Sequence, residues 1–157
     1  MPNLERRRFT VALCEQRNEV LLVRRAGESG NGERWTVPSY ESAARRFEQL
    51  GEQLETETGV AVADYDGMRF FVQVLTPAEE PEEITYGIGL QVMPPDPLPG
   101  HVRWAPRDEA IAALASEPNV TQREPLICYL NGECVSEMAW AYRRNASGNL
   151  DLLARLG

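Results

Sequence analysis

The sequence contains no lysine and only one histidine in 157 residues, so all sixteen basic residues are arginines. The absence of lysine excludes a Schiff-base lysine and the lysine of a phosphate-binding P-loop. The single histidine, His101, argues against a zinc site, because zinc is held by several histidine and cysteine ligands. His101 lies in a connection rich in proline and glycine. We therefore expect a loop residue rather than the base of a serine triad.

Cysteines are few and long apolar runs are missing. Cys14, Cys128 and Cys134 have no regular spacing, which is typical of buried or free thiols in a reducing cytoplasm. The first residues lack the apolar core of a signal peptide, and no apolar run reaches membrane-spanning length. We therefore expect a cytoplasmic protein without a membrane partner.

The composition is typical of one globular domain that covers residues 1–157. Hydrophobic residues make up 43% of the chain and charged residues 25%. The formal net charge is -8, which argues against a nucleic-acid partner, because phosphate contacts need a basic surface. A chain of this length can bury roughly 70% of its unfolded surface, so it needs no metal or disulfide to fold.

The order of apolar patterns predicts a mixed sheet with helices packed on it. Alternation predicts two strands joined by a tight turn in residues 7–25, and a hairpin in residues 68–94 around an acidic loop. A helix with an apolar stripe precedes Gly59, which is a plausible stop. A short strand is expected at 102–106 and a helix from 107. Residues 121–133 and 134–144 are expected to be helical, broken by Pro125 and Gly132.

Three stretches in this order resemble the Nudix hydrolase family, whose members cleave nucleoside diphosphates linked to another moiety. They are "NEVLLVRR" at the end of the opening hairpin, "ERWTVP" before the helix, and "ETGV" at the helix end, followed later by "VRWAPRDEAIAAL". The resemblance covers about residues 8–130. It implies an α+β fold, an α/β/α sandwich in which helices flank a mixed β-sheet. Residues 131–157 would form a helical extension.

The family carries a box of metal-binding glutamates on the helix, and this chain keeps few of them. With Gly59 and Val60 aligned to the end of the box, Glu57 is the one carboxylate that remains at a box position. The resemblance therefore makes Glu57 the candidate catalytic residue and metal ligand, with Mg²⁺ or Mn²⁺ as the cofactor if the protein is catalytic. The candidate ligand-binding residues, which lie on the same helix edge or at a strand end beside the cleft, are Arg24, Arg25, Arg46, Gln53 and Thr56.

Other glutamates offer two possible replacements for the missing ligands. Glu48, Glu52 and Glu55 share one helix face, because they are spaced i, i+4 and i+7. At about 100° per residue this face lies nearly opposite the stripe of Ala43, Phe47, Leu50 and Leu54, so we expect it to face solvent. The loop acids Glu79, Glu80, Glu82 and Glu83 are either a soluble hairpin loop or a substitute acid cluster.

Three functions follow from this sequence. The first is a Nudix-fold protein with a degenerate metal-binding box, which binds a nucleotide-type diphosphate ligand with weak or no standard pyrophosphohydrolase activity. The second is a divergent but active hydrolase that uses Glu57 with acids from elsewhere. The third is an interaction or regulatory module, in which Met138, Ala139 and Trp140 lie on a partner-facing helix that could form a homodimer contact.

Overall fold

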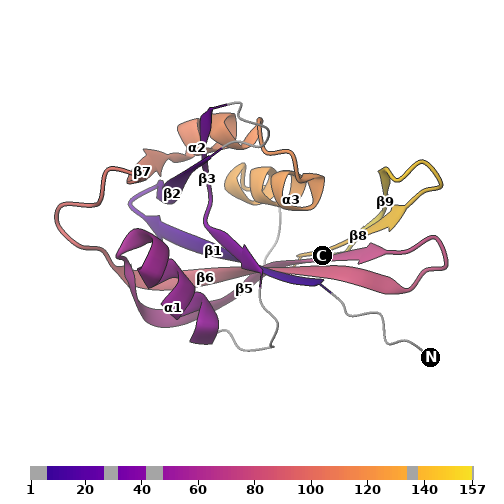
Figure 1. Ribbon diagram of the computed structural model, residues 1–157, viewed down its shortest axis with the longest axis horizontal. Coiled ribbons are helices and arrows are strands. Elements are labelled where there is room, and N and C mark those ends of the chain that lie inside the picture. Colours follow the sequence, from indigo (N-terminus) through magenta and orange to yellow (C-terminus); the bar gives the residue numbers. More distant parts are fainter. Residues whose placement is uncertain (1–6, 27–31, 42–47, 134–137, 157) are drawn as a thin grey trace.

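A computed structural model of the chain describes residues 7–26, 32–41, 48–133 and 138–156. In these ranges a mixed nine-stranded sheet is flanked by three helices, an α/β/α sandwich. Helix α1 covers one face of the sheet, and α2 and α3 cover the other (Figure 1). The predicted fold class is confirmed. None of these helices combines the length and the apolar character that a membrane span needs.

The main sheet has the strand order β3-β2-β1-β6-β5-β8-β9, with β4 paired to β1 and β7 paired to β2. The strands are β1 (Arg7–Gln16), β2 (Glu19–Ala26), β3 (Glu33–Thr36), β4 (Ser39–Glu41), β5 (Ala61–Leu75), β6 (Pro81–Met93), β7 (Val102–Pro106), β8 (Met138–Arg144) and β9 (Leu150–Leu156). The helices are α1 (Glu48–Thr58), α2 (Arg107–Leu114) and α3 (Val120–Leu130).

The opening hairpin confirms the predicted tight turn and connects two groups of strands, one around β1 and one around β2. Arg17 and Asn18 have φ angles of 44° and 69°, the left-handed pair that a two-residue hairpin turn requires. The strands β1 and β2 pair only beside this turn. Beyond it β1 joins β6 and β4, while β2 joins β3 and β7. Side chains of α1 pack against strands of both groups.

The apolar stripe of α1 is buried where the structure describes it. Leu50 is 2% exposed and Leu54 0%, and both pack with one face of the sheet in a cluster that includes Cys14 and Leu90. The helix ends as expected at Gly59, whose φ is +76°. The Thr58 hydroxyl donates to the Leu54 carbonyl at 2.6 Å and accepts from the Val60 N–H at 3.1 Å. These contacts fix the rotation of the last helical turn. Ala43 and Phe47 lie outside the described residues.

The expectation of a helical C-terminal extension is wrong. Residues 138–144 form β8, which runs parallel to β5, and β9 pairs with β8 in turn. The alternation of side chains along this segment favours a strand over a helix, because it places Trp140 and Tyr142 together on one buried face of β8. Trp140 is 4% exposed, so it does not lie on a partner-facing helix. Helix α3 was expected, and it ends near Gly132, but it continues through Pro125 instead of breaking there.

The cysteines differ in one respect from the expectation of buried or free thiols. Cys14 is free and fully buried near the end of β1. Burial, followed by the nearby charge of Glu15, raises the pKa of the Cys14 thiol to about 12. Cys128 on α3 is disulfide-bonded, which corrects the expectation for this residue. The expectation for Cys134 falls outside the described residues.

Candidate functional site

Glu57, the candidate metal ligand from the sequence, is held by two side chains from the sheet. Arg25 on β2 donates from Nε to Oε2 at 2.9 Å and from Nη2 to Oε1 at 2.7 Å. The Tyr40 hydroxyl on β4 donates to Oε1 at 2.6 Å. Arg25 also lies over the Tyr40 ring, 5.3 Å from its centroid. Both carboxylate oxygens of Glu57 are therefore already engaged in charge-assisted hydrogen bonds.

Electrostatic interactions keep Glu57, Arg25 and Tyr40 each in a single protonation state at neutral pH. Burial raises the pKa of Glu57, but the hydrogen bonds from Arg25 and Tyr40 outweigh it, so the net pKa lies below the usual value. For Arg25, burial lowers the pKa and the bond to Glu57 raises it above its usual value. Burial, and then the bond to Glu57, raises the pKa of Tyr40. Glu57 is ionised, Arg25 is charged and Tyr40 stays a donor.

His101 joins the same site from the loop before β7. Its Nε2 lies 2.6 Å from the Glu57 carbonyl oxygen. Carbonyl groups in the last turn of a helix have no partner within the helix, so His101 satisfies this one. The backbone carbonyl of His101 accepts from the Arg24 N–H at 2.8 Å. His101 thus ties the end of α1 to the strand that carries Arg25. The sequence showed His101 only as a loop residue, because its partner is 44 positions away.

Arg24 and Arg25, the two candidate ligand-binding residues at the end of β2, lie on opposite faces of that strand. Neighbouring residues of a strand point to opposite sides. Arg25 faces α1, where it meets Glu57. Arg24 faces the other side, where its Nε lies 3.1 Å from Glu33 and its guanidinium is 5.7 Å from the Trp35 ring centroid. Arg103 on β7 lies over the same ring at 5.0 Å. The structure thus brings Arg24 together with Arg103.

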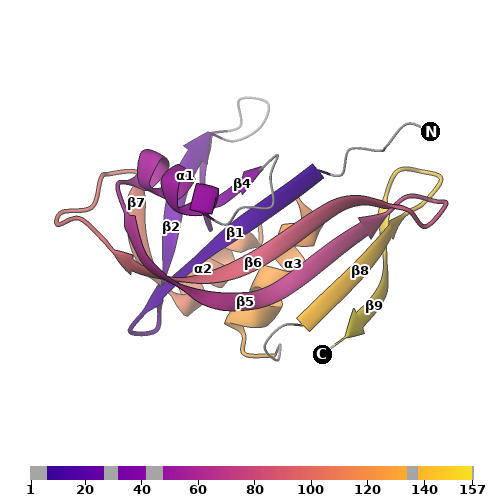
Figure 2. The same cartoon turned by 90° about the horizontal axis from the view of Figure 1, so that it is seen from below.

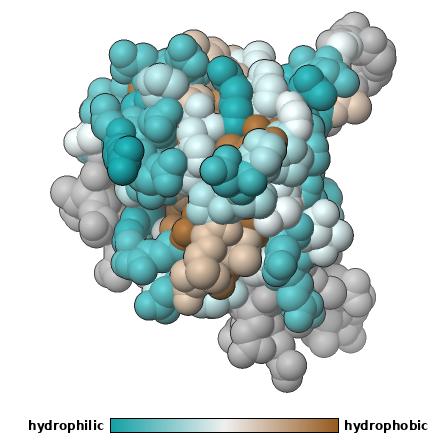
Figure 3. All heavy atoms as spheres, turned by 90° about the vertical axis from the view of Figure 1, so that its left-hand side faces the viewer, coloured by the Kyte–Doolittle hydropathy of each residue, from teal (hydrophilic) through white to brown (hydrophobic). Residues whose placement is uncertain are grey.

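The other candidate residues on the helix edge contribute less to the site. The Gln53 amide donates to the Glu41 carbonyl at 3.3 Å, so it ties α1 to β4. Thr56 is exposed. Arg46 lies outside the described residues. The end of the molecule that carries α1 and β7 has a mostly hydrophilic surface, with a small group of apolar side chains near its centre (Figure 3).

The acidic faces expected as alternatives lie away from Glu57. Glu52 and Glu55 are exposed, as predicted, and the side chain of Glu48 is outside the described part of the chain. Glu52 and Glu55 line a hollow of about 350 Å³ with Asp64 and Tyr65 of β5. The acidic hairpin loop is at the end of the sheet far from β7 (Figure 2). Two of its acids pair with arginines of β8, Glu79 with Arg143 at 3.2 Å and Glu82 with Arg144 at 2.7 Å.

This architecture matches solved structures of known proteins at low sequence identity. A NUDIX hydrolase from Nitrosomonas europaea has a TM-score of 0.68 and 14% identity, covering 90% of this chain and 81% of its own. A mutator MutT protein from Bacillus halodurans has a TM-score of 0.59 and 14% identity, covering 95% of both chains. The chain has the Nudix fold. An ADP compounds hydrolase is similar too, with a TM-score of 0.53 and 14% identity over 81% of this chain and 74% of that one. No family model and no curated protein sequence matches the chain.

A Nudix fold generally implies a divalent metal on the box helix, and the donors found here do not fit one. Mg²⁺ needs several oxygen ligands in near-octahedral order. Glu57 is the one carboxylate that the sequence resemblance assigns to a metal, and its two oxygens accept from Arg25 and Tyr40. In the described ranges no three or more histidine, cysteine, aspartate or glutamate side chains are grouped so that they could hold a metal ion.

Proposed function

We propose that this Nudix-fold protein binds a nucleotide-type diphosphate ligand and does not catalyse the standard metal-dependent hydrolysis. The observation that carries the proposal is the engagement of Glu57 by Arg25 and Tyr40. A cation that displaced Arg25 would leave an arginine whose side chain is only 27% exposed without its partner. Removing one partner of a largely buried pair is costly, because the other charge remains. The ion pair therefore competes against a metal at Glu57.

The ligand-binding part of the proposal is supported by Arg24, Arg103 and Trp35. Two guanidinium groups lie over one indole ring on neighbouring strands. Each is about two-fifths exposed, and each pairs with a carboxylate that is more exposed still, Glu33 or Glu109. Exposed pairs of this kind contribute only about 0–1 kcal/mol. A diphosphate can displace the carboxylates at little cost, because bidentate arginine–phosphate contacts are stronger.

The fold supports the same class of ligand. One of the similar structures is described as a hydrolase of ADP compounds, and a ligand of that kind carries both a diphosphate for the arginines and a base for stacking. Fold alone does not determine function, so the class of ligand depends on the arginines and on this analogy together.

A thermal-shift experiment tests both halves of the proposal. ADP, ADP-ribose and nucleotide-sugars are added with EDTA, Mg²⁺ or Mn²⁺, and release of phosphate or nucleotide is followed in parallel. A ligand at 100 times its Kd stabilises the fold by about 2.7 kcal/mol, which raises Tm by about 5–11 °C for a chain of this size. We expect the same rise with EDTA as with metal, and no turnover.

Matched variants locate the binding site. Arg24→Gln should reduce the rise, whereas Arg143→Gln should not, because Arg143 is also 41% exposed and paired with a glutamate but lies on β8. The binding half fails if no ligand raises Tm. The non-catalytic half fails if Mg²⁺ or Mn²⁺ supports turnover. Loss of that turnover in Glu57→Gln would then identify a divergent active hydrolase that uses Glu57.

A further inference from the structure

A second cavity, of about 360 Å³, lies between α3 and the β8–β9 hairpin. It is on the face of the sheet opposite to α1, because its buried residues belong to the core cluster under α2 and α3 and not to the cluster under α1. Its volume is in the range of small-molecule sites. It shares no lining residue with the site around Glu57 or with the arginines at Trp35.

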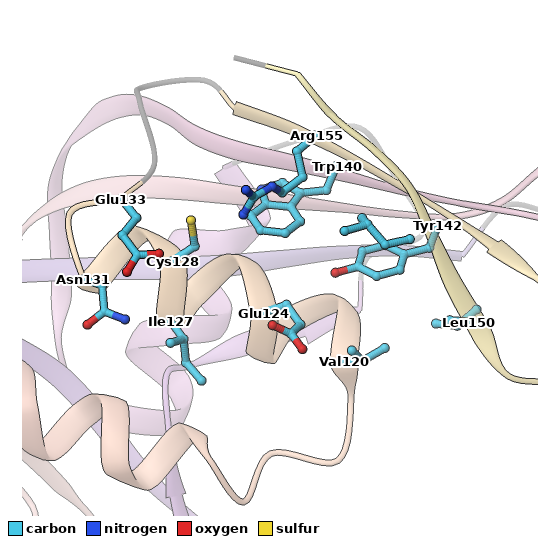
Figure 4. Close-up of a pocket in the computed structure, with 11 residues that line it drawn as sticks. Val120, Glu124, Ile127, Cys128, Asn131, Glu133, Trp140, Tyr142, Leu150 and Arg155 are labelled. Carbon is cyan, nitrogen blue, oxygen red and sulfur yellow. The ribbon is translucent and has the colours of Figure 1, made fainter.

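The residues that line this cavity follow the helical spacing on α3 and the strand alternation on β8. Glu124, Ile127 and Asn131 are spaced three and four apart, so they share one face of α3. Trp140 and Tyr142 alternate on one face of β8. On β9, Arg155 is the register partner of Trp140, and Leu152 is the partner of Tyr142. Figure 4 shows Trp140, Tyr142 and Arg155 of the hairpin above α3, which carries Glu124 and Ile127.

The floor of the cavity contains two polar groups without hydrogen-bond partners. Trp140 is 4% exposed and Tyr142 3%. The Trp140 Nε1 and the Tyr142 hydroxyl are both buried and unpaired. Buried polar groups in folded proteins nearly always have a partner, and leaving one unpaired destabilises the folded state. The Tyr142 hydroxyl points from β8 into the space above α3 (Figure 4).

Charges of both signs surround these two donors. The Arg155 guanidinium lies 5.2 Å from the Trp140 ring centroid. Glu124 and Glu133 line the helix side, and both are exposed. Burial, followed by Glu124, raises the pKa of Tyr142 to about 12, while Arg123 and Arg155 lower it. The hydroxyl is therefore a donor at neutral pH, and charges of opposite sign lie near it.

We propose that this cavity binds a free α-amino acid with an apolar side chain. Its carboxylate accepts from the Tyr142 hydroxyl and the Trp140 indole and pairs with Arg155. Its ammonium group faces Glu124 and Glu133, and its side chain lies against Ile127 and Leu152. A polyphosphate is disfavoured by the two carboxylates, and a metal ion is disfavoured because indole and phenol donate protons and do not ligate it.

Calorimetric titration with the L-amino acids tests this proposal on the full chain. We expect an apolar amino acid to bind. The corresponding amine, which lacks the carboxylate, and the corresponding carboxylic acid, which lacks the ammonium group, should each bind at least tenfold more weakly. Tyr142→Phe and Glu124→Gln should each weaken binding about tenfold, and Glu55→Gln on α1 should not change it.

The same variants decide whether the unpaired hydroxyl is available to a ligand. Tyr142→Phe should be at least as stable toward urea as the parent chain, because the hydroxyl that it loses makes no bond. A clear loss of stability would mean that the hydroxyl is satisfied within the protein, and the proposal would be wrong. It would also be wrong if no amino acid bound, if the amine alone bound equally well, or if Tyr142→Phe and Glu124→Gln bound like the parent.

Discussion

Glu57→Gln tests whether Glu57 is a structural ion-pair residue. The substitution keeps the size of the side chain but removes the charge that accepts two bonds from Arg25 and one from Tyr40. Exposed ion pairs are worth about 0.2–1 kcal/mol, and breaking a fully buried pair costs about 3–5 kcal/mol. Arg25 and Glu57 are 27% and 28% exposed, which places the pair between these limits, nearer to burial.

We therefore expect Glu57→Gln to lower the free energy of unfolding by about 2–3 kcal/mol, the range for losing hydrogen bonds to a charged group. For a chain of this size the Tm should fall by about 4–12 °C. Urea unfolding followed by tryptophan fluorescence measures the change. Glu55→Gln is the control on the same helix, and it should change stability by no more than about 0.5 kcal/mol because Glu55 is exposed.

A double-mutant cycle with Arg25→Met isolates the pair. If Arg25 and Glu57 stabilise one another, the double variant should be less destabilised than the sum of the two single variants, by about 1–2 kcal/mol. A Glu57→Gln variant as stable as the parent would refute the reasoning. So would a parent chain that Mg²⁺ stabilises while the variant does not respond, since that would make Glu57 a metal ligand.

Two further predictions follow from the same structure. The net pKa of Glu57 is lowered in the folded state, so its contribution to the free energy of unfolding is complete above the unfolded pKa of about 4.3 and is lost as pH falls through the lower folded value. The urea midpoints of the parent and of Glu57→Gln should therefore converge in acid. A difference between these midpoints that is unchanged at pH 3 would contradict this. Gly87→Ala should cost about 1–3 kcal/mol, because its Cβ would lie 2.4 Å from the buried Phe70 ring. Gly89→Ala should cost less, because it meets the end of the Arg69 side chain, and equal urea midpoints for the two variants would refute the distinction.

Much of the fold could be predicted from local patterns. The turn at Arg17 and Asn18, the stripe of Leu50 and Leu54, and the stop at Gly59 each depend on residues close in sequence, and each is found where it was expected. The strand β8 was missed because methionine, alanine and arginine favour helices. Its alternation of small residues with Trp140 and Tyr142 was the better signal.

The site was less predictable, because its contacts join distant parts of the chain. Glu57 could be found by its box position, but Arg25 and Tyr40 are 32 and 17 positions away. Strand alternation could have shown that Arg24 and Arg25 point to opposite faces of β2. Nothing local indicated that His101 would bond the helix end, since a loop residue has no period from which to infer its direction.

Because Cys14 is buried, the rate at which it reacts with alkylating reagents reports how often the sheet opens. The thiol is 0% exposed on β1, opposite Leu90 of β6. Burial also raises its pKa to about 12, so the thiol is protonated at pH 7 and is a poor nucleophile. Alkylating reagents therefore modify Cys14 only when β1 separates from its neighbours. The rate of labelling at Cys14, followed by mass spectrometry, counts these opening events without any substitution in the chain.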